Sequence, residues 1–231
     1  MFPHAARYHW LTDAARYHWL TEIARYWIKG SPLLSVPEIG LELPVGRGDI
    51  AIDCGANVGD ITSMLARTGA HVYAFEPNPR CFEILAKRFR SFTNVDCVNA
   101  GVMDRPGKLT LRVPQAHAHY STIQASHAGS FESDALALGH YSITETVVDC
   151  IDLAQFILSL GRRIRFVKLD VEGSEIQIID KMIDTNAIEA CDLVEVETHE
   201  RLSPRLHKET VHLRERIHRE GLDEKIRLDW I

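Results

Sequence analysis

The chain has 231 residues, of which 45% are hydrophobic and 25% charged, and its formal net charge at pH 7 is −6. This length and composition are typical of one globular domain with a short extension. The negative charge weighs against a nucleic-acid partner, because surfaces that bind nucleic acid are usually basic. No apolar run approaches the 18 residues that would indicate a membrane-spanning helix, so we expect no membrane span.

Five cysteines are scattered singly along the chain, at positions 54, 81, 97, 150 and 191. Without a C-x-x-C pair, this spacing indicates reduced thiols and neither a disulfide framework nor a zinc site. The first residues, Met-Phe-Pro-His, lack the basic and apolar regions of a signal peptide. We therefore expect a cytoplasmic protein.

A nonapeptide is duplicated near the start of the chain, as AARYHWLTD at 5–13 and AARYHWLTE at 14–22. Nine residues turn a helix by about 900°, so the two copies would face opposite sides and form no single apolar stripe. We expect residues 1–45 to be a helical extension that packs loosely on the domain. A partner-binding arm, a substrate lid and a membrane-surface helix are the alternatives, and a homo-oligomer formed through this extension is a further expectation.

From residue 46 to residue 231 the pattern alternates strands and helices, which predicts a single α/β domain with a doubly wound, mostly parallel, Rossmann-like sheet. Such sheets bind ligands beyond the carboxyl ends of their strands, where the strand order switches. The expected strands are 50–54, 70–76, 95–102, 109–113, 144–149, 165–170, 192–198 and 225–230. The expected helices are 60–68, 79–89, 152–159, 174–183 and 205–220.

The first strand ends in a glycine-rich segment, Asp53-Cys-Gly55-Ala-Asn57-Val-Gly59. Small residues let the backbone pass close to a ligand, and the amides at the start of the next helix offer hydrogen-bond donors. A dinucleotide motif would have a second glycine where this chain has Asn57. The Asp53 carboxylate would repel a pyrophosphate but attract an ammonium group, so the segment favours S-adenosylmethionine over NAD.

Glu76 ends the second strand, 21 residues after Gly55. An acid at this spacing can accept hydrogen bonds from both hydroxyls of a cofactor ribose. The alternative is a solvated carboxylate that helps to open the next helix. Two other functions stay open on these residues: a nucleotide-cofactor oxidoreductase of NAD type, and a module that binds a cofactor or partner without catalysis.

Three motifs, D-x-G-A-N-x-G at 53–59, F-E-P-N-P at 75–79 and K-x-D-x-E-G-x-E at 168–175, together resemble the FkbM family of S-adenosylmethionine-dependent methyltransferases. The resemblance covers about two thirds of the chain and implies a class I methyltransferase fold. It also implies O-methylation of a hydroxyl on a sugar or secondary metabolite. The implied cofactor residues are Asp53, Gly55, Asn57 and Gly59 at the methionine end, Glu76 at the ribose, and Asn99 and Gly101 near the adenine.

Polar residues gather after two later strands, with Asp170 and Glu172 following one and Glu197 and His199 following the next. If these strands are neighbours, the four side chains converge beside the transferring methyl group. We expect Asp170, Glu172 and His199 to be catalytic, with His199 as proton acceptor and Asp170 orienting the acceptor hydroxyl. One alternative is a hard divalent metal bound by three oxygens and one imidazole, although we name no metal-binding residues from the sequence. Another alternative is a purely structural role.

The His-rich segment 115–140 contains an H-x-H pair at 117 and 119. Because a third ligand at fixed spacing is absent from the sequence, we expect a mobile loop over the active site and no metal site there. The methyl acceptor is expected to be a small molecule or a saccharide, and its identity cannot be read from the residues.

Overall fold

The computed structural model describes residues 35–36, 41–42, 45–114, 143–200 and 203–228. The chain divides into two units, residues 1–42 and residues 43–231. In the first unit, β1 (Ser35–Val36) pairs antiparallel with β2 (Leu41–Glu42). The duplicated nonapeptide and the helix and oligomer contact expected there lie outside the described residues.

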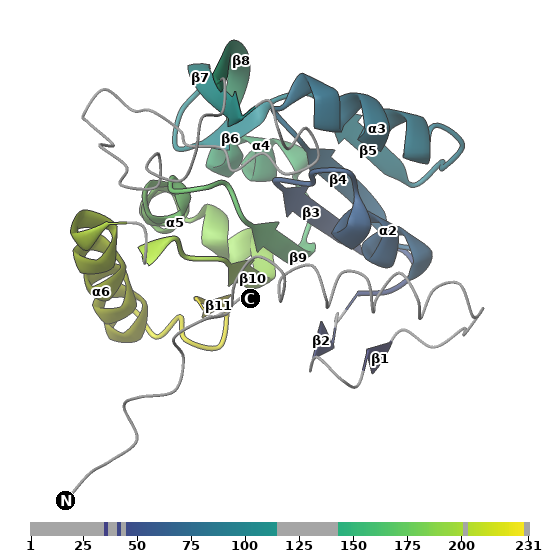
Figure 1. The fold of residues 1–231 in the computed structure, drawn as a ribbon. Helices are drawn as coiled ribbons and strands as arrows, with labels where there is room; N and C mark the ends of the chain where they lie inside the picture. Colours follow the sequence, from purple (N-terminus) through teal and green to yellow (C-terminus); the bar gives the residue numbers. More distant parts are fainter. Residues whose placement is uncertain (1–34, 37–40, 43–44, 115–142, 201–202, 229–231) are drawn as a thin grey trace, which may run out of the picture. The chain divides into compact units, whose positions relative to one another are not determined.

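The second unit is built on a six-stranded sheet in the order β11-β10-β9-β3-β4-β5, with every neighbouring pair parallel (Figure 1). The expected doubly wound α/β fold is therefore confirmed. The chain runs outward from β3 through β4 in one direction and continues from β9 in the other, which makes the β3–β9 boundary the switch point. The strands are β3 (Ile50–Cys54), β4 (His71–Phe75), β5 (Val95–Val98), β9 (Ile164–Leu169), β10 (Cys191–Val196) and β11 (Ile226–Arg227).

Successive strand residues face opposite sides of the sheet, and each side has its own apolar core. Ile52 belongs to the core that contains the buried residues of α4, α5 and α6, whereas its neighbour Ala51 belongs to the core that contains those of α2 and α3. The helices are α2 (Asp60–Arg67), α3 (Pro79–Phe89), α4 (Leu153–Leu160), α5 (Glu175–Asp184) and α6 (Pro204–Arg219), with a short 3-10 turn, η3 (Ala187–Ala190).

Side-chain caps explain where several helices begin. Asn78, Asp152 and Ser203 each accept a hydrogen bond from an amide in the first turn of α3, α4 and α6. Ser174 precedes α5 without such a bond. The amides before α5 are instead bound by the Glu175 side chain.

A second sheet covers the carboxyl end of the first. It has the order β6-β8-β7, with β6 (Gly101–Met103), β7 (Gly107–Pro114) and β8 (Ile143–Asp152). The single strand expected at 95–102 is therefore two strands, because the chain turns at Asn99 and Ala100 and passes from one sheet to the other. Among the described residues, no helix combines the length and the apolar character that crossing a membrane requires.

Candidate active site

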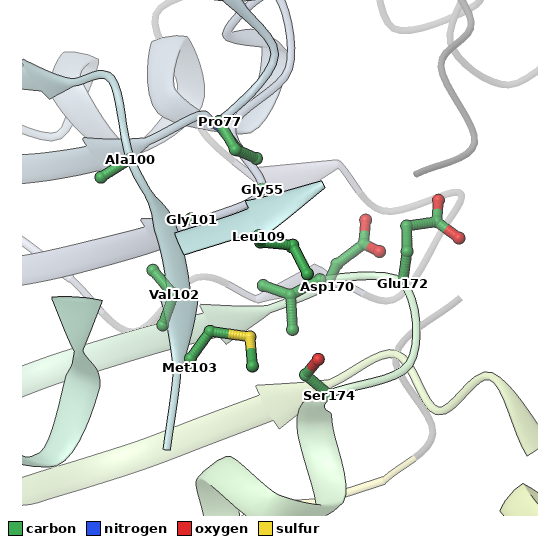
Figure 2. A pocket seen from close by; sticks show the side chains of 11 residues that line it. Gly55, Pro77, Ala100, Gly101, Val102, Met103, Leu109, Asp170, Glu172 and Ser174 are labelled. Carbon is green, nitrogen blue, oxygen red and sulfur yellow. The ribbon is translucent and has the colours of Figure 1, made fainter. Parts of the chain in front are cut away.

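A pocket opens at the carboxyl end of the parallel sheet, at the switch point. Figure 2 shows apolar side chains of β6 and β7 along one wall and the carboxylates that follow β9 on another. The lining residues are Gly55, Pro77, Ala100, Gly101, Val102, Met103, Leu109, Asp170, Val171, Glu172 and Ser174.

Close packing explains two glycines of the first motif. Gly55 has φ +78°, and a Cβ atom placed on it would lie 1.9 Å from the Asp170 carbonyl oxygen. Gly59 has φ +92°, and its Cβ would lie 2.4 Å from the ring of Phe89 on α3. Gly55 therefore allows the loop to pass against the end of β9 at the pocket, whereas Gly59 allows α2 to pack against α3.

Asp53 is fully buried and does not line the pocket. Its Oδ2 accepts a hydrogen bond of 2.6 Å from Thr62 Oγ1, and its Oδ1 accepts none but lies 3.6 Å from Lys168 Nζ. The cation that faces the Asp53 carboxylate is therefore the Lys168 ammonium of the protein itself, whereas the sequence had suggested the ammonium group of a ligand. Asp53 therefore holds the loop from behind the residues that line the pocket.

Lys168 contacts two residues that line the pocket, although the sequence predicted no role for it. Its ammonium donates to the Gly55 carbonyl oxygen at 2.9 Å and lies 3.2 Å from Asp170 Oδ2, with 5% of the side chain exposed. Burial lowers its pKa, but the carboxylates of Asp170 and Asp53 outweigh burial and raise the pKa above its ordinary value. The available signal was a lysine between apolar residues at the carboxyl end of a central strand.

Glu76 is also buried beside the pocket and not on its surface. Its two carboxylate oxygens accept hydrogen bonds of 2.7 Å from the backbone amides of Asn57 and Asn78. Asn99 donates to the carbonyl oxygens of Glu76 and Pro77 and so supports the same loop. Of the seven residues expected to bind the cofactor, Gly55 and Gly101 line the pocket, and the other five are not among its lining residues.

The acid cluster, which we define as Asp170, Glu172, Glu175 and His199, brings together the three residues expected to be catalytic. His199 Nε2 lies 3.0 Å from Glu172 Oε2 and 3.8 Å from Asp170 Oδ1. His199 Nδ1 lies 3.0 Å from Glu175 Oε1. Glu197, whose amide donates to Leu169, adds negative charge near Lys168.

Within the acid cluster, the described contacts give Glu175 a structural role. Its carboxylate is buried and accepts hydrogen bonds from the amides of Val171 and Gly173 as well as facing His199. Glu172 has φ +59°, an uncommon backbone conformation for a residue other than glycine, and Asp170 and Glu172 line the pocket. The carboxylates of Asp170 and Glu172 are therefore the members that a bound molecule would meet.

His199 does not have the surroundings of a free base. Burial lowers its pKa, but the carboxylates of Glu172 and Glu175 outweigh this effect and raise the pKa to about 11. A neutral imidazole that accepts a proton near pH 7 was the expectation from sequence. In the protein alone, the neighbouring carboxylates favour a cation at this position instead.

Comparison with known proteins agrees with this architecture. Residues 53–222 match the model of the methyltransferase FkbM domain. Hexuronic acid methyltransferase AglP of Haloferax volcanii is 27% identical over 158 residues, which cover 68% of this chain and 59% of that protein. Ribosomal RNA small subunit methyltransferase A of Lactiplantibacillus plantarum is 31% identical over 84 residues, which cover 30% of this chain and 28% of that protein.

Among solved structures, a putative rRNA-methylase from Clostridium thermocellum aligns with 74% of this chain and 75% of its own, at 10% identity and a TM-score of 0.38. The chain spans less than two thirds of the length of the curated relatives it matches. The family model, however, covers well over half of the chain and includes both the glycine-rich segment and the acid cluster. The chain belongs to the FkbM methyltransferase family.

Proposed function

We propose that the protein transfers a methyl group from S-adenosylmethionine to a hydroxyl of a small molecule or saccharide. The observation that carries this proposal is the pocket itself, which lies at the switch point and has an apolar wall facing an acidic one. A cofactor with a flat aromatic base at one end and a sulfonium and ammonium at the other matches this division. The family assignment favours a methyl donor over NAD.

The pocket residues fit each part of that cofactor. Met103 and Leu109 are apolar and would cover the adenine, beside Gly101. Glu76 lies behind the lining residues, and it would accept the ribose hydroxyls through the lone pair that each of its oxygens keeps beside one backbone hydrogen bond. Gly55 would let the methionine end lie against the loop, within reach of the Asp170 carboxylate.

When bound, S-adenosylmethionine supplies an electrophilic methyl group. Asp170 would hold the acceptor hydroxyl so that its oxygen points at that methyl group, and the acid cluster would take up the proton as the O–C bond forms and the C–S electron pair stays on sulfur. Aligning the three reacting atoms contributes up to about 7–11 kcal/mol. A positioned base adds about 10²–10⁴-fold.

Calorimetry on the full chain tests the cofactor. S-adenosylhomocysteine is expected to bind, and NAD is expected not to bind. The Leu109→Asp variant places a charge in the apolar wall and should weaken binding at least about tenfold, whereas the surface control Val147→Asp, on the neighbouring β8 and 63% exposed, should not. Tight binding of NAD without S-adenosylhomocysteine would refute the proposal.

Labelled S-adenosylmethionine tests the acceptor. The relative named a hexuronic acid methyltransferase supports starting with free and oligosaccharide-bound uronic acids, followed by extracts of the native host. Asp170→Asn should lower kcat about 10²–10⁴-fold while S-adenosylhomocysteine still binds. If label enters no acceptor although the cofactor binds, the non-catalytic alternative replaces the enzyme.

A further inference from the structure

We propose that Asp170, Glu172 and His199 bind one divalent cation of the Mg²⁺ or Mn²⁺ class at the acidic wall of the pocket. This inference rests on the proposed function and deepens it, because the cation would hold the acceptor hydroxyl. Oxygen-rich donor sets with one imidazole suit these ions. The sequence left a divalent metal here only as an alternative, and the comparisons assign none to these side chains. Among the described residues, Asp170, Glu175 and His199 have ligand atoms within 4.8 Å of one another, and we place Glu175 behind the site because its carboxylate already accepts from two amides and faces Nδ1.

The first support is a buried nitrogen without a hydrogen bond. His199 has 8% of its side chain exposed, and its Nε2 makes no hydrogen bond among the described residues although Glu172 Oε2 lies 3.0 Å away. Two donor atoms that share a cation at about 2.1 Å and at right angles lie about 3.0 Å apart. The pair therefore has the spacing of two ligands without the alignment of a hydrogen bond.

The second support is the partner on the other ring nitrogen. His199 Nδ1 lies 3.0 Å from Glu175 Oε1, and Glu175 is itself fixed by the amides of Val171 and Gly173. A metal would replace the proton that the neighbouring carboxylates otherwise favour on Nε2, and the bond from Nδ1 to Glu175 would then direct the freed Nε2 lone pair, an arrangement that recurs around metal-binding histidines. Here it directs Nε2 toward Glu172 and Asp170.

The third support is that the two carboxylate oxygens of Asp170 face different groups. Its Oδ2 lies 3.2 Å from the Lys168 ammonium, while its Oδ1 is the oxygen that faces His199 Nε2. Lys168 is also held by the Gly55 carbonyl oxygen, so it cannot swing over to neutralise Glu172 without breaking that bond. A divalent cation between Oδ1, Glu172 and His199 would take the place of the His199 proton and balance the negative charge of both carboxylates.

Such a cation would act on the acceptor side of the pocket, since Asp170 and Glu172 both line it. As a Lewis acid it would polarise the acceptor hydroxyl, and the proton released as the methyl group arrives would pass to a carboxylate of the cluster. Acceptors with a second oxygen next to the reacting hydroxyl would bind best, because both oxygens can coordinate. Sugars and hydroxy acids have this pattern.

Electron paramagnetic resonance of Mn²⁺ tests the site on the full chain after chelator treatment. The wild type is expected to bind one equivalent of Mn²⁺, which is measured as a loss of the signal of free, hydrated Mn²⁺. Glu172→Gln and His199→Gln should each weaken this binding at least about tenfold. The matched control is His71→Gln, which removes a histidine that pairs with Asp96 outside the pocket and should leave Mn²⁺ binding unchanged.

Glu172→Gln keeps the size of a partly exposed side chain, so it is the variant to rely on if His199→Gln fails to fold. No Mn²⁺ binding, or binding that Glu172→Gln leaves unchanged, overturns the cation site. Calorimetry with S-adenosylhomocysteine separates this inference from the proposed function. Cofactor binding without a Glu172-dependent cation refutes only the cation, whereas a Glu172-dependent cation without cofactor binding refutes only the methyl-donor proposal.

Discussion

Lys168 and Asp53 stand opposite each other on neighbouring parallel strands, with Lys168 Nζ 3.6 Å from Asp53 Oδ1. Both side chains are almost completely buried, and the lysine also reaches Gly55 and Asp170. The ion pair therefore connects the glycine-rich loop after β3 with the acidic wall after β9. This buried pair is the physical link between the loop expected to hold the cofactor and the acids expected to carry the reaction.

Replacing Lys168 with methionine should lower the free energy of unfolding by about 3–5 kcal/mol, because it leaves the buried Asp53 carboxylate without a cation. Urea denaturation measures this change. The matched control is Lys108→Met, which removes an exposed lysine that lies 2.6 Å from Asp149. The control should cost less than about 1 kcal/mol, and equal losses in the two variants would contradict a structural role for the buried pair.

Thr62→Val tests the other contact of Asp53. The change removes the hydroxyl that donates to Oδ2 at 2.6 Å and leaves a buried carboxylate oxygen without that bond. A loss of about 1.5–3 kcal/mol of unfolding free energy is expected, since the bond involves a charged acceptor. The conservative variant Thr62→Ser retains the hydroxyl and should recover most of the loss, and a Ser variant as unstable as Val would assign the effect to packing.

Much of the fold could be predicted because its signals are local. The predicted strand 50–54 and the helix from residue 79 to residue 89 coincide with β3 and α3, since an apolar run and an Asn-Pro start define them from the sequence alone. The break after β5 could not be predicted, because valines at 95, 98 and 102 suggest one continuous strand. The turn depends on Asn99 binding carbonyl oxygens of the loop after β4, which is a contact between distant segments.

The site divides in the same way. Convergence of Asp170, Glu172 and His199 follows from two parallel strands ending at one edge, so sequence reasoning could predict it. The pairing of Asp53 with Lys168 depends on the register between β3 and β9, which no residue pattern specifies. Sequence reasoning therefore identified the acids correctly as a group but could not tell which acid a lysine of the protein already neutralises.

Gly55→Ala should destabilise the protein more than the same change at a glycine with open surroundings. At both Gly55 (φ +78°) and Gly161 (φ +58°), alanine costs about 1–2 kcal/mol for the left-handed backbone. At Gly55 the new methyl group would also lie 1.9 Å from the Asp170 carbonyl oxygen, whereas nothing lies within 4 Å at Gly161. Overpacking adds about 1–3 kcal/mol. Urea denaturation of the two variants measures the difference, and equal losses would show that the loop can move away from β9.

The Glu76 carboxyl predicts how stability depends on pH. Burial raises its pKa from an ordinary 4.5 to about 7, against the opposing hydrogen bonds from the amides of Asn78 and Asn57 and the charge of Lys168, while Asp53 adds to the rise. Between these two pKa values the folded protein keeps a proton that the unfolded chain releases. The contribution of this group is therefore present below about pH 4.5 and is lost as the pH rises to about 7, by up to about 3 kcal/mol.

Glu76→Gln, which does not titrate, isolates this contribution. Between pH 5 and pH 8, the unfolding free energy of the wild type should fall by up to about 3 kcal/mol more than that of Glu76→Gln. Urea denaturation without cofactor measures both values. Parallel pH curves for the two proteins would show that Glu76 titrates normally. Because the ribose hydroxyls would donate to the ionised carboxylate, the wild type should also bind S-adenosylhomocysteine more tightly at pH 8 than at pH 6, and Glu76→Gln should bind it weakly at both.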